Sequence, residues 1–177
     1  RKLNKSLLIA QIGRLANNRK MTSPILWIAI PTAAELINKM NESLVVYQVS
    51  DKYDSNSEDH MVNPETIRSL HEYAIERADI VLYSGRKLLA EAATGLEKSY
   101  LLEQAVDFDH WATTTDLTPA DEIAAISRPR IGYFGAVEPW LMNQDLIKRA
   151  SVERPEWNWI FIGNRARGTD LANLPNV

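Results

Sequence analysis

Three continuous apolar runs punctuate the chain, at residues 25–30, 44–49 and 79–84. Pro24 and Pro31 bound the first run, and the second leads into the polar turn from Ser50 to Asp54. Runs of this length are typical of strands that are buried on both faces of a parallel sheet. Because parallel neighbours need a crossover connection of about a dozen residues, the segments between the runs predict βαβ units. We therefore expect these strands to lie parallel and adjacent in one sheet, with a shorter fourth strand at residues 100–102.

Apolar residues at helical spacing occupy the segments between these strands. They predict a surface helix over residues 7–15, a helix over residues 33–40 that Thr32 caps, and a helix from Ser84 or Gly85 to Ala93. The string Asn63-Pro64-Glu65 is typical of a helix start, with Asn as the cap and Pro in the first turn. Residues 55–63 are polar and without periodicity, which indicates a loop. The predicted buried stripe of the helix after Asn63 comprises Ile67, Leu70, His71, Ala74, Ile75 and Ala78.

The stretch RIGYFGAVEPW, residues 130–140, begins a second βαβ unit. A strand at residues 130–135 ends on Gly135, a helix is predicted from Trp140 to Val152, and a strand at residues 157–162 ends on Gly163. Each of these strands carries a glycine at its carboxyl end, where a ligand can approach the backbone. Ser127-Arg128-Pro129 is typical of a linker. It predicts a first domain at residues 1–127 and a second at residues 128–177, each with its own sheet.

Composition narrows the functions that the chain can have. A length of 177 residues with 45% hydrophobic and 24% charged residues is ordinary for a globular protein. The formal net charge of -3, with interspersed signs, favours neither nucleic acid nor a polybasic contact with a membrane. The absence of cysteine excludes disulfides, thiolate nucleophiles and thiolate zinc sites. No apolar run approaches the ~18 residues that span a bilayer. The chain begins without methionine and ends on what reads as the entry to another strand, so we expect a fragment of a longer protein.

Several strings, taken in order, resemble group 1 glycosyltransferases of the GT-B fold, in which two Rossmann-like domains face each other across a cleft. The resemblance runs through nearly the whole chain. It is carried by Pro24-Ile25-Leu26-Trp27 with Pro31, by residues 44–51 (LVVYQVSD), by residues 78–84 (ADIVLYS), by Val106-Asp107 with Trp111, by residues 131–135 (IGYFG) with Trp140, and by the strings at 154–163 and 174–177.

The resemblance implies an α/β fold of GT-B type with Rossmann-like parallel sheets, present here in incomplete form. Residues 1–127 would be part of the acceptor-side domain, and residues 128–177 would begin the nucleotide-sugar domain. The implied reaction transfers a sugar from a nucleotide sugar to a hydroxyl of a glycan, a lipid-linked acceptor or a small molecule, without a cofactor. The implied location is cytoplasmic, with attachment at the periphery of a membrane as the second option, and this chain alone is expected to be inactive.

Two strings depart from the family pattern. Gln104-Ala105 stands where the family commonly has Asn-Gly, and Ala136-Val137 stands where basic residues often follow the first glycine of the donor domain. Because the second departure falls where the family contacts phosphate, a non-catalytic Rossmann-like binding or assembly module is the alternative function. A GT-B-type sugar-nucleotide epimerase is a third and more distant one.

Sugar transfer requires that the leaving diphosphate be stabilised, and backbone N–H groups at a helix N-terminus supply that stabilisation. The turn from Gly135 to Trp140 is placed to do so. Arg165 and Arg167 add two guanidinium groups, which bind phosphate oxygens in a planar fork. The alternative interpretation is that the glycines only permit tight turns and that the arginines are solvated.

An inverting transferase also needs a base for the acceptor hydroxyl, whereas a retaining one does without it. Asp51 is the first candidate, because it follows the carboxyl end of a buried strand, where doubly wound sheets bind ligands. Asp54 is the second candidate, and a turn or capping aspartate is the alternative for both. His60, His71 and His110 lack the mutual spacing of a metal site, so we interpret them as structural and predict no metal.

Overall fold

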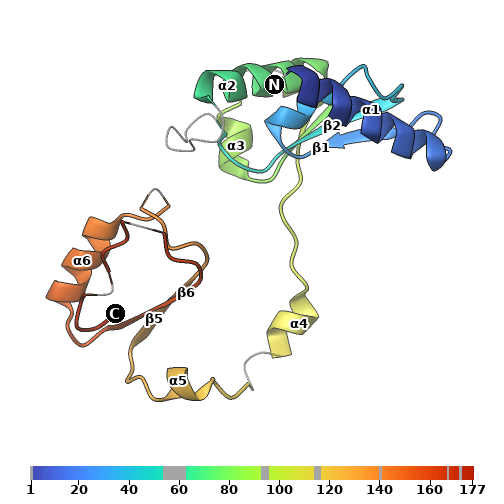
Figure 1. The fold of residues 1–177 in the computed structure, drawn as a ribbon. Helices are drawn as coiled ribbons and strands as arrows, with labels where there is room; N and C mark the ends of the chain where they lie inside the picture. The colour runs from blue at the N-terminus through green and yellow to red at the C-terminus, as the bar shows by residue number, and fades with distance from the viewer. Residues whose placement is uncertain are drawn as a thin grey trace. The chain divides into compact units, whose positions relative to one another are not determined.

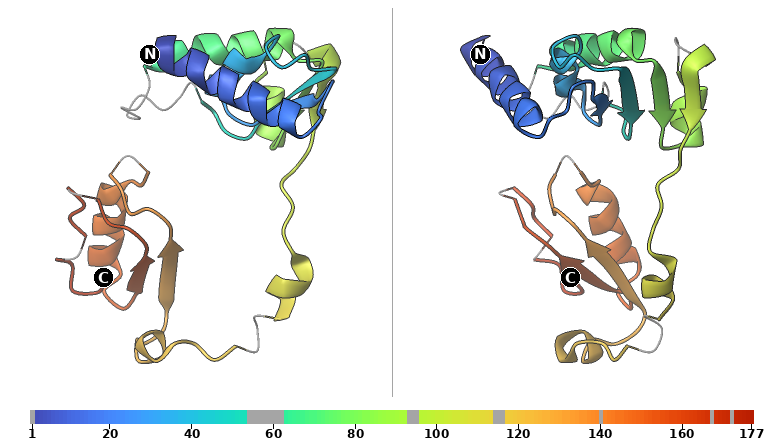
Figure 2. Two further views of the ribbon diagram at one scale, coloured as in Figure 1. Left: turned by 45° about the vertical axis from the view of Figure 1, so that its right-hand side comes forward. Right: turned by 90° about the vertical axis from the view of Figure 1, so that its right-hand side faces the viewer.

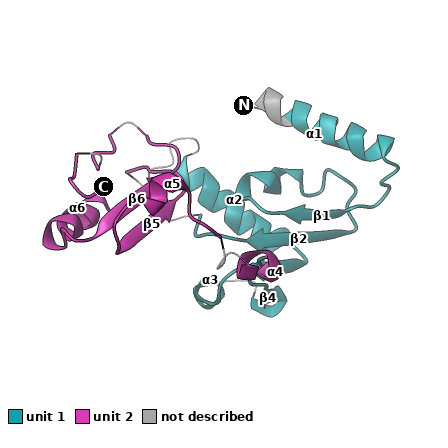
Figure 3. Ribbon diagram, turned by 90° about the horizontal axis from the view of Figure 1, so that it is seen from below, with its two compact units in different colours: residues 1–106 teal, residues 107–177 magenta. Residues whose placement is uncertain are grey.

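The structure is a computed structural model that describes residues 2–53, 63–92, 96–113, 117–139, 141–166, 168–171 and 173–177. The chain divides into two compact units, Arg1–Val106 and Asp107–Val177, called unit 1 and unit 2 below (Figure 3). This division lies ahead of the linker at residues 127–129, on which the domain prediction rests. Two short helices of unit 2, α4 (Phe108–Ala112) and α5 (Asp121–Ala124), lie in the chain between this division and the linker.

Unit 1 contains a four-stranded sheet in which every pair of neighbours is parallel (Figure 1). The strand order is β1-β2-β3-β4, and the register pairs Trp27 with Val46 and Tyr47 with Val81. The parallel Rossmann-like arrangement expected from the apolar runs is therefore confirmed. The strands are β1 (Ile25–Ile28), β2 (Leu44–Val49), β3 (Ile80–Tyr83) and β4 (Ser99–Leu101).

Three helical segments pack on this sheet and close the core of unit 1: the 3-10 helix η1 (Pro31–Leu36), α2 (Pro64–Arg77) and α3 (Arg86–Ala90). The Asn63 side chain caps α2 by accepting the N–H groups of Glu65 and Thr66, as its sequence predicts. The fully buried side chains of Ile28, Tyr47 and Val81 lie at the centre of the core. A second short 3-10 helix, η2 (Leu96–Lys98), precedes β4.

The structure corrects three local predictions in unit 1. The helix expected over residues 33–40 is the 3-10 helix η1, and Asn38 beyond it adopts a positive φ of 61°, which stops a helix. The helix expected to reach Ala93 is the short α3. The strand β1 is not buried on both faces, because Ile25 and Trp27, which lie on one face, are more than half exposed, whereas Ile28 on the other face is buried. The predicted surface helix is α1 (Lys2–Asn18).

Unit 2 is built on a parallel pair of strands, β5 (Arg130–Phe134) and β6 (Asn158–Ile162), with α6 (Gln144–Glu153) between them in the chain (Figure 2). The predicted second sheet is confirmed. The start predicted for its helix is wrong: α6 begins at Gln144 instead of Trp140. Asn143 sets this start, because its side chain accepts the Leu146 N–H at 3.0 Å.

None of the helices that the structure describes is both long enough and apolar enough to cross a membrane.

Candidate functional site

The loop after β2 is fixed at the carboxyl edge of the sheet in unit 1. The Ser84 N–H donates to the Val49 carbonyl at 3.0 Å, and the Ser84 hydroxyl donates to the Ser50 carbonyl at 3.2 Å, which ties the loop to the end of β3. On the other side, the Tyr53 hydroxyl donates to the Ala29 carbonyl, just past β1, at 2.8 Å. Asp51 lies between these anchors, so the structure places it at the sheet edge where the sequence analysis expected it.

A pocket of about 500 Å³ opens beside this loop. Its wall combines the loop after β2 with one face of α2 and one face of α3. The apolar part is formed by Val49, Ile75, Tyr83, Leu88 and Ala92, and the polar part by Asp51, Lys52, Tyr53, Arg68, His71, Glu72 and Glu91. Residues that are distant in the sequence thus meet around one cavity, in the position where open α/β sheets bind ligands.

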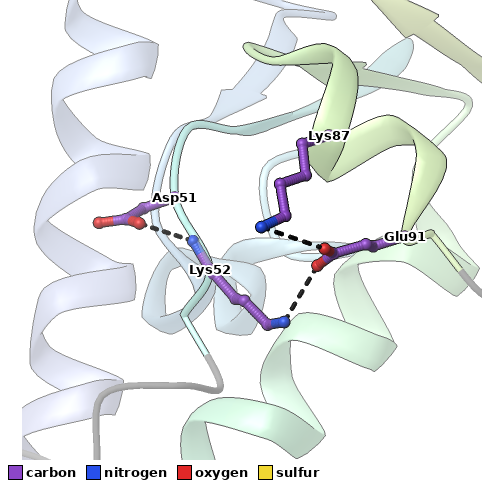
Figure 4. A network of polar contacts seen from close by, with 4 residues as sticks. All are labelled: Asp51, Lys52, Lys87 and Glu91. Atoms are coloured by element: carbon purple, nitrogen blue, oxygen red, sulfur yellow. Dashed lines mark hydrogen bonds and ion pairs between the residues drawn. The ribbon is translucent and has the colours of Figure 1, made fainter.

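The charged groups at the rim form a small network (Figure 4). The Lys52 ammonium contacts a carboxylate oxygen of Glu91 at 3.0 Å, and Lys87 approaches the other oxygen at 3.8 Å. The hydrogen bond and charge of Lys52 hold the pKa of Glu91 below its ordinary value. These ion pairs are exposed, so they add little to stability, but they leave the Lys52 ammonium paired with Glu91. Asp51 accepts the N–H of Lys52 at 2.7 Å, and no described residue forms an ion pair with it.

His71 forms part of the pocket wall and also contacts the core. Its Nδ1 atom lies 2.7 Å from the hydroxyl of Tyr47, a fully buried residue. Burial raises the pKa of Tyr47, and which of the two groups donates depends on the tautomer of the His71 ring. The ring of Tyr53 lies at a tilt beside His71, with centroids 6.2 Å apart.

Sequence reasoning missed the pocket-lining positions Arg68, His71 and Glu72. All are on α2, and His71 was interpreted as a structural residue within the apolar stripe. The sequence did contain a signal: His71, a polar and titratable residue, stands in the predicted apolar stripe, one helical turn from the charged Arg68.

Gly135 and Gly163 lie at the carboxyl ends of β5 and β6 and adopt positive φ values of 140° and 149°. The Gly135 N–H donates to the Ile162 carbonyl at 2.9 Å, and pairing continues past both strands through Val137 and Asn164. A Cβ atom at Gly163 would overlap the Gly135 carbonyl oxygen, and one at Gly135 would lie 3.3 Å from the Tyr133 hydroxyl. The two glycines thus allow the strand ends to touch, and the Gly135 N–H is already used by the fold.

A second pocket, of about 300 Å³, lies entirely within unit 2. Gly163 and the exposed Arg165 line it, together with Val137, Thr169 and Leu171. The Thr169 side chain is turned to the backbone, because its hydroxyl donates to the Val137 carbonyl at 3.0 Å. Arg165 therefore supplies the cationic group of this pocket within the described part of unit 2.

Of the remaining candidates, only His110 lies among the described residues, and it lines neither pocket. Arg167, Asp54 and His60 lie outside the described residues. His110 is in α4, where its ring packs edge-on to Trp111 at 5.5 Å. Among the described residues, no group of His, Asp and Glu side chains is arranged to hold a metal ion.

Comparison with known proteins finds a relative by sequence and a solved structure of similar fold. No protein-family model matches the chain. A Bacillus subtilis protein named "Putative teichuronic acid biosynthesis glycosyltransferase TuaH" is 24% identical over 166 residues, which cover 86% of this chain and 42% of that protein. The crystal structure of Anabaena HepE in complex with UDP and glucose matches 91% of this chain and 44% of its own, with a TM-score of 0.61 and 15% identity. The chain therefore spans about two fifths of each and shares the fold of HepE.

Proposed function

We propose that this chain contributes to a glycosyltransferase of GT-B type, group 1, which transfers a sugar from a nucleotide donor to an acceptor hydroxyl. The similarity to TuaH carries the proposal, because 86% of the chain takes part and both units are therefore included. The likeness of the fold to HepE, whose crystals hold UDP and glucose, supports it and makes a UDP-sugar the first donor to test. The cytoplasmic location, with or without peripheral attachment to a membrane, belongs to the same proposal.

In this proposal the acceptor enters the pocket of unit 1. Asp51 takes the proton of the acceptor hydroxyl while that oxygen forms its bond to the anomeric carbon and the bond to the nucleoside diphosphate breaks. Two observations support the role: the carboxylate is exposed at the rim of a 500 Å³ pocket, and no described cation neutralises it. A retaining reaction would not need this base.

The donor nucleotide occupies unit 2 in this proposal. Arg165 pairs with the diphosphate oxygens from the wall of the pocket, and its planar guanidinium suits that contact. Gly135 contributes by lacking a side chain, which leaves room for the ligand. It does not contribute its N–H, which already donates to the Ile162 carbonyl. Arg167, two residues further on, remains a candidate for a second contact.

The proposal is tested on the natural-length protein by comparing Asp51→Asn with the exposed-carboxylate control Asp109→Asn. Asp51→Asn should leave UDP affinity unchanged and, for an inverting enzyme, slow transfer by roughly 10²-fold or more. Arg165→Gln should weaken UDP binding by about tenfold, the loss expected for one charge-assisted contact. Calorimetric titration with UDP and product analysis with UDP-sugars measure both quantities.

The outcomes separate the candidate functions. A natural-length protein that binds UDP but transfers no sugar from any UDP-sugar would support the non-catalytic binding module. That module is favoured by the occupied Gly135 N–H and by Ala136-Val137 at a position where basic residues are expected. Absence of binding to every nucleotide tested would rule out the transferase and leave the assembly module.

A further inference from the structure

Three carboxylates and two cationic groups line the pocket of unit 1. Lys52 is paired with Glu91, which Lys87 also approaches, so neither lysine is free to hold an anion. The other charged lining groups are Asp51, Glu72 and Arg68, two carboxylates and one guanidinium. The pocket therefore has no positive excess, and a ligand carrying a carboxylate or phosphate would face like charges on two sides.

The rest of the wall is suited to the faces of a small ring. Ile75, Leu88 and Ala92 supply apolar surface, and the rings of Tyr53 and His71 stand at 57° to each other beside it. The volume of about 500 Å³ lies within the range of small-ligand sites, which combine apolar walls with a few convergent polar groups. Here those polar groups include acceptors on Asp51 and Glu72 and a five-donor guanidinium on Arg68.

Hydroxyl groups are the ligand groups that satisfy this mixture. Each hydroxyl both donates and accepts, so a row of them on one ring can donate to the carboxylates and accept from the guanidinium. A fatty chain would leave the charged groups desolvated and unpaired, which is costly. An anion would pair with Arg68 but repel Asp51 and Glu72.

We propose that the pocket of unit 1 binds an uncharged sugar ring, which is the end of the acceptor that receives the transferred sugar. This inference rests on the proposed function and goes further, because it names a neutral carbohydrate instead of a lipid phosphate or an acidic sugar as the group that enters unit 1. Asp51 lies in the same wall, so a ring held by Glu72 and Arg68 brings a hydroxyl to the proposed base.

The test titrates the 177-residue chain with glucose and N-acetylglucosamine, and in parallel with glucuronate and glucose 6-phosphate, followed by amide NMR. The neutral sugars should shift the amide signals of Lys52, Tyr53, His71 and Glu72. The two anions should bind at least about fivefold more weakly, as expected for repulsion between partly solvated charges. Binding of an anion as tightly as its neutral counterpart would overturn the inference, as would shifts confined to other residues or no shift at concentrations up to about 100 mM.

Two exposed glutamates of α2 provide a matched pair of variants. Glu72→Gln removes a charge from the pocket wall, and Glu76→Gln removes one from the same helix outside the pocket. Only Glu72→Gln should narrow the gap between glucose and glucuronate, by about threefold or more. An equal change in both variants would show that the selectivity comes from the overall charge of the chain, and it would overturn the proposed contact.

A titration with UDP keeps this inference separate from the proposed function. UDP binding that shifts unit 2 while no sugar enters the pocket would leave the transferase proposal standing and end the inference. If a natural-length protein binds a sugar in this pocket but transfers none, the inference stands and the transferase proposal fails.

Discussion

Replacing Gly163 with alanine tests whether unit 2 depends on the contact between its two strand ends. The new Cβ atom would overlap the backbone carbonyl oxygen of Gly135, which cannot rotate away as a side chain does. Gly163 also adopts a φ of 149°, which L side chains rarely adopt. Both features oppose the substitution, and both belong to the fold and not to a ligand.

The magnitude follows from these two features. A residue held at an unfavourable positive φ costs about 1–3 kcal/mol. Relieving the overlap requires the ends of β5 and β6 to separate, which weakens the hydrogen bonds from Gly135 to Ile162 and from Val137 to Asn164. At about 0.5–1.5 kcal/mol for each bond, the expected loss in the free energy of unfolding is about 2–6 kcal/mol in total.

Gly132→Ala is the matched control. Gly132 lies in the middle of β5 and is not among the residues with positive φ, and a methyl group added to it would meet no heavy atom within 4 Å. Because glycine weakens a strand by roughly 0.5–1 kcal/mol relative to alanine, this variant should be neutral or slightly more stable than the parent. Of the two glycine substitutions, only Gly163→Ala is thus expected to lower the free energy of unfolding.

Urea unfolding, monitored by hydrogen exchange and mass spectrometry, measures the loss of stability separately in each unit. Peptides from unit 2 should lose protection in Gly163→Ala, whereas peptides from unit 1 serve as the internal reference. A loss below about 1 kcal/mol would refute the close contact between the strand ends. Unchanged stability with weakened UDP binding would instead assign Gly163 to the ligand.

Three further predictions concern unit 1. Tyr47→Phe removes the hydrogen bond to His71 and should lower the free energy of unfolding by about 1 kcal/mol, with the exposed Tyr100→Phe as control; equal urea midpoints for the two variants would contradict it. Burial raises the pKa values of Tyr47, Tyr53 and Tyr83. The free energy of unfolding should therefore be highest below the unfolded-state pKa of about 10 and fall as the pH rises above it, by up to about 1.4 kcal/mol per pH unit for each tyrosine. Unfolding curves that coincide from neutral to strongly alkaline pH would refute this. Lys98→Met removes the ammonium that donates to the Glu76 and Ala78 carbonyls at the end of α2, and its melting temperature should fall below that of the exposed-lysine control Lys39→Met, corresponding to about 1 kcal/mol.

The sequence by itself determined the elements whose signals are local. The apolar run at residues 44–49 predicts β2, and Asn63-Pro64 predicts the first turn of α2, because strand burial patterns and helix caps depend on residues a few positions apart. The parallel order followed from the length of the connections. The errors at η1 and α6 also have local causes, since a positive φ at Asn38 and a cap at Asn143 were not recognised.

Only the tertiary structure decided which distant residues share a surface. Whether each face of β1 is buried depends on what packs against it, so Trp27 is more than half exposed although it lies in an apolar run. The pocket joins Asp51 to Arg68 and Glu91, which come from three separate elements, so no spacing in the sequence indicates it. Likewise, Gly163 needs to lack a side chain because of Gly135, a residue on the neighbouring strand. Local propensity selects helices and strands, whereas contacts between them arise from the packing of the whole unit. The sequence therefore indicated Asp51, but the pocket around it became visible only in the folded chain.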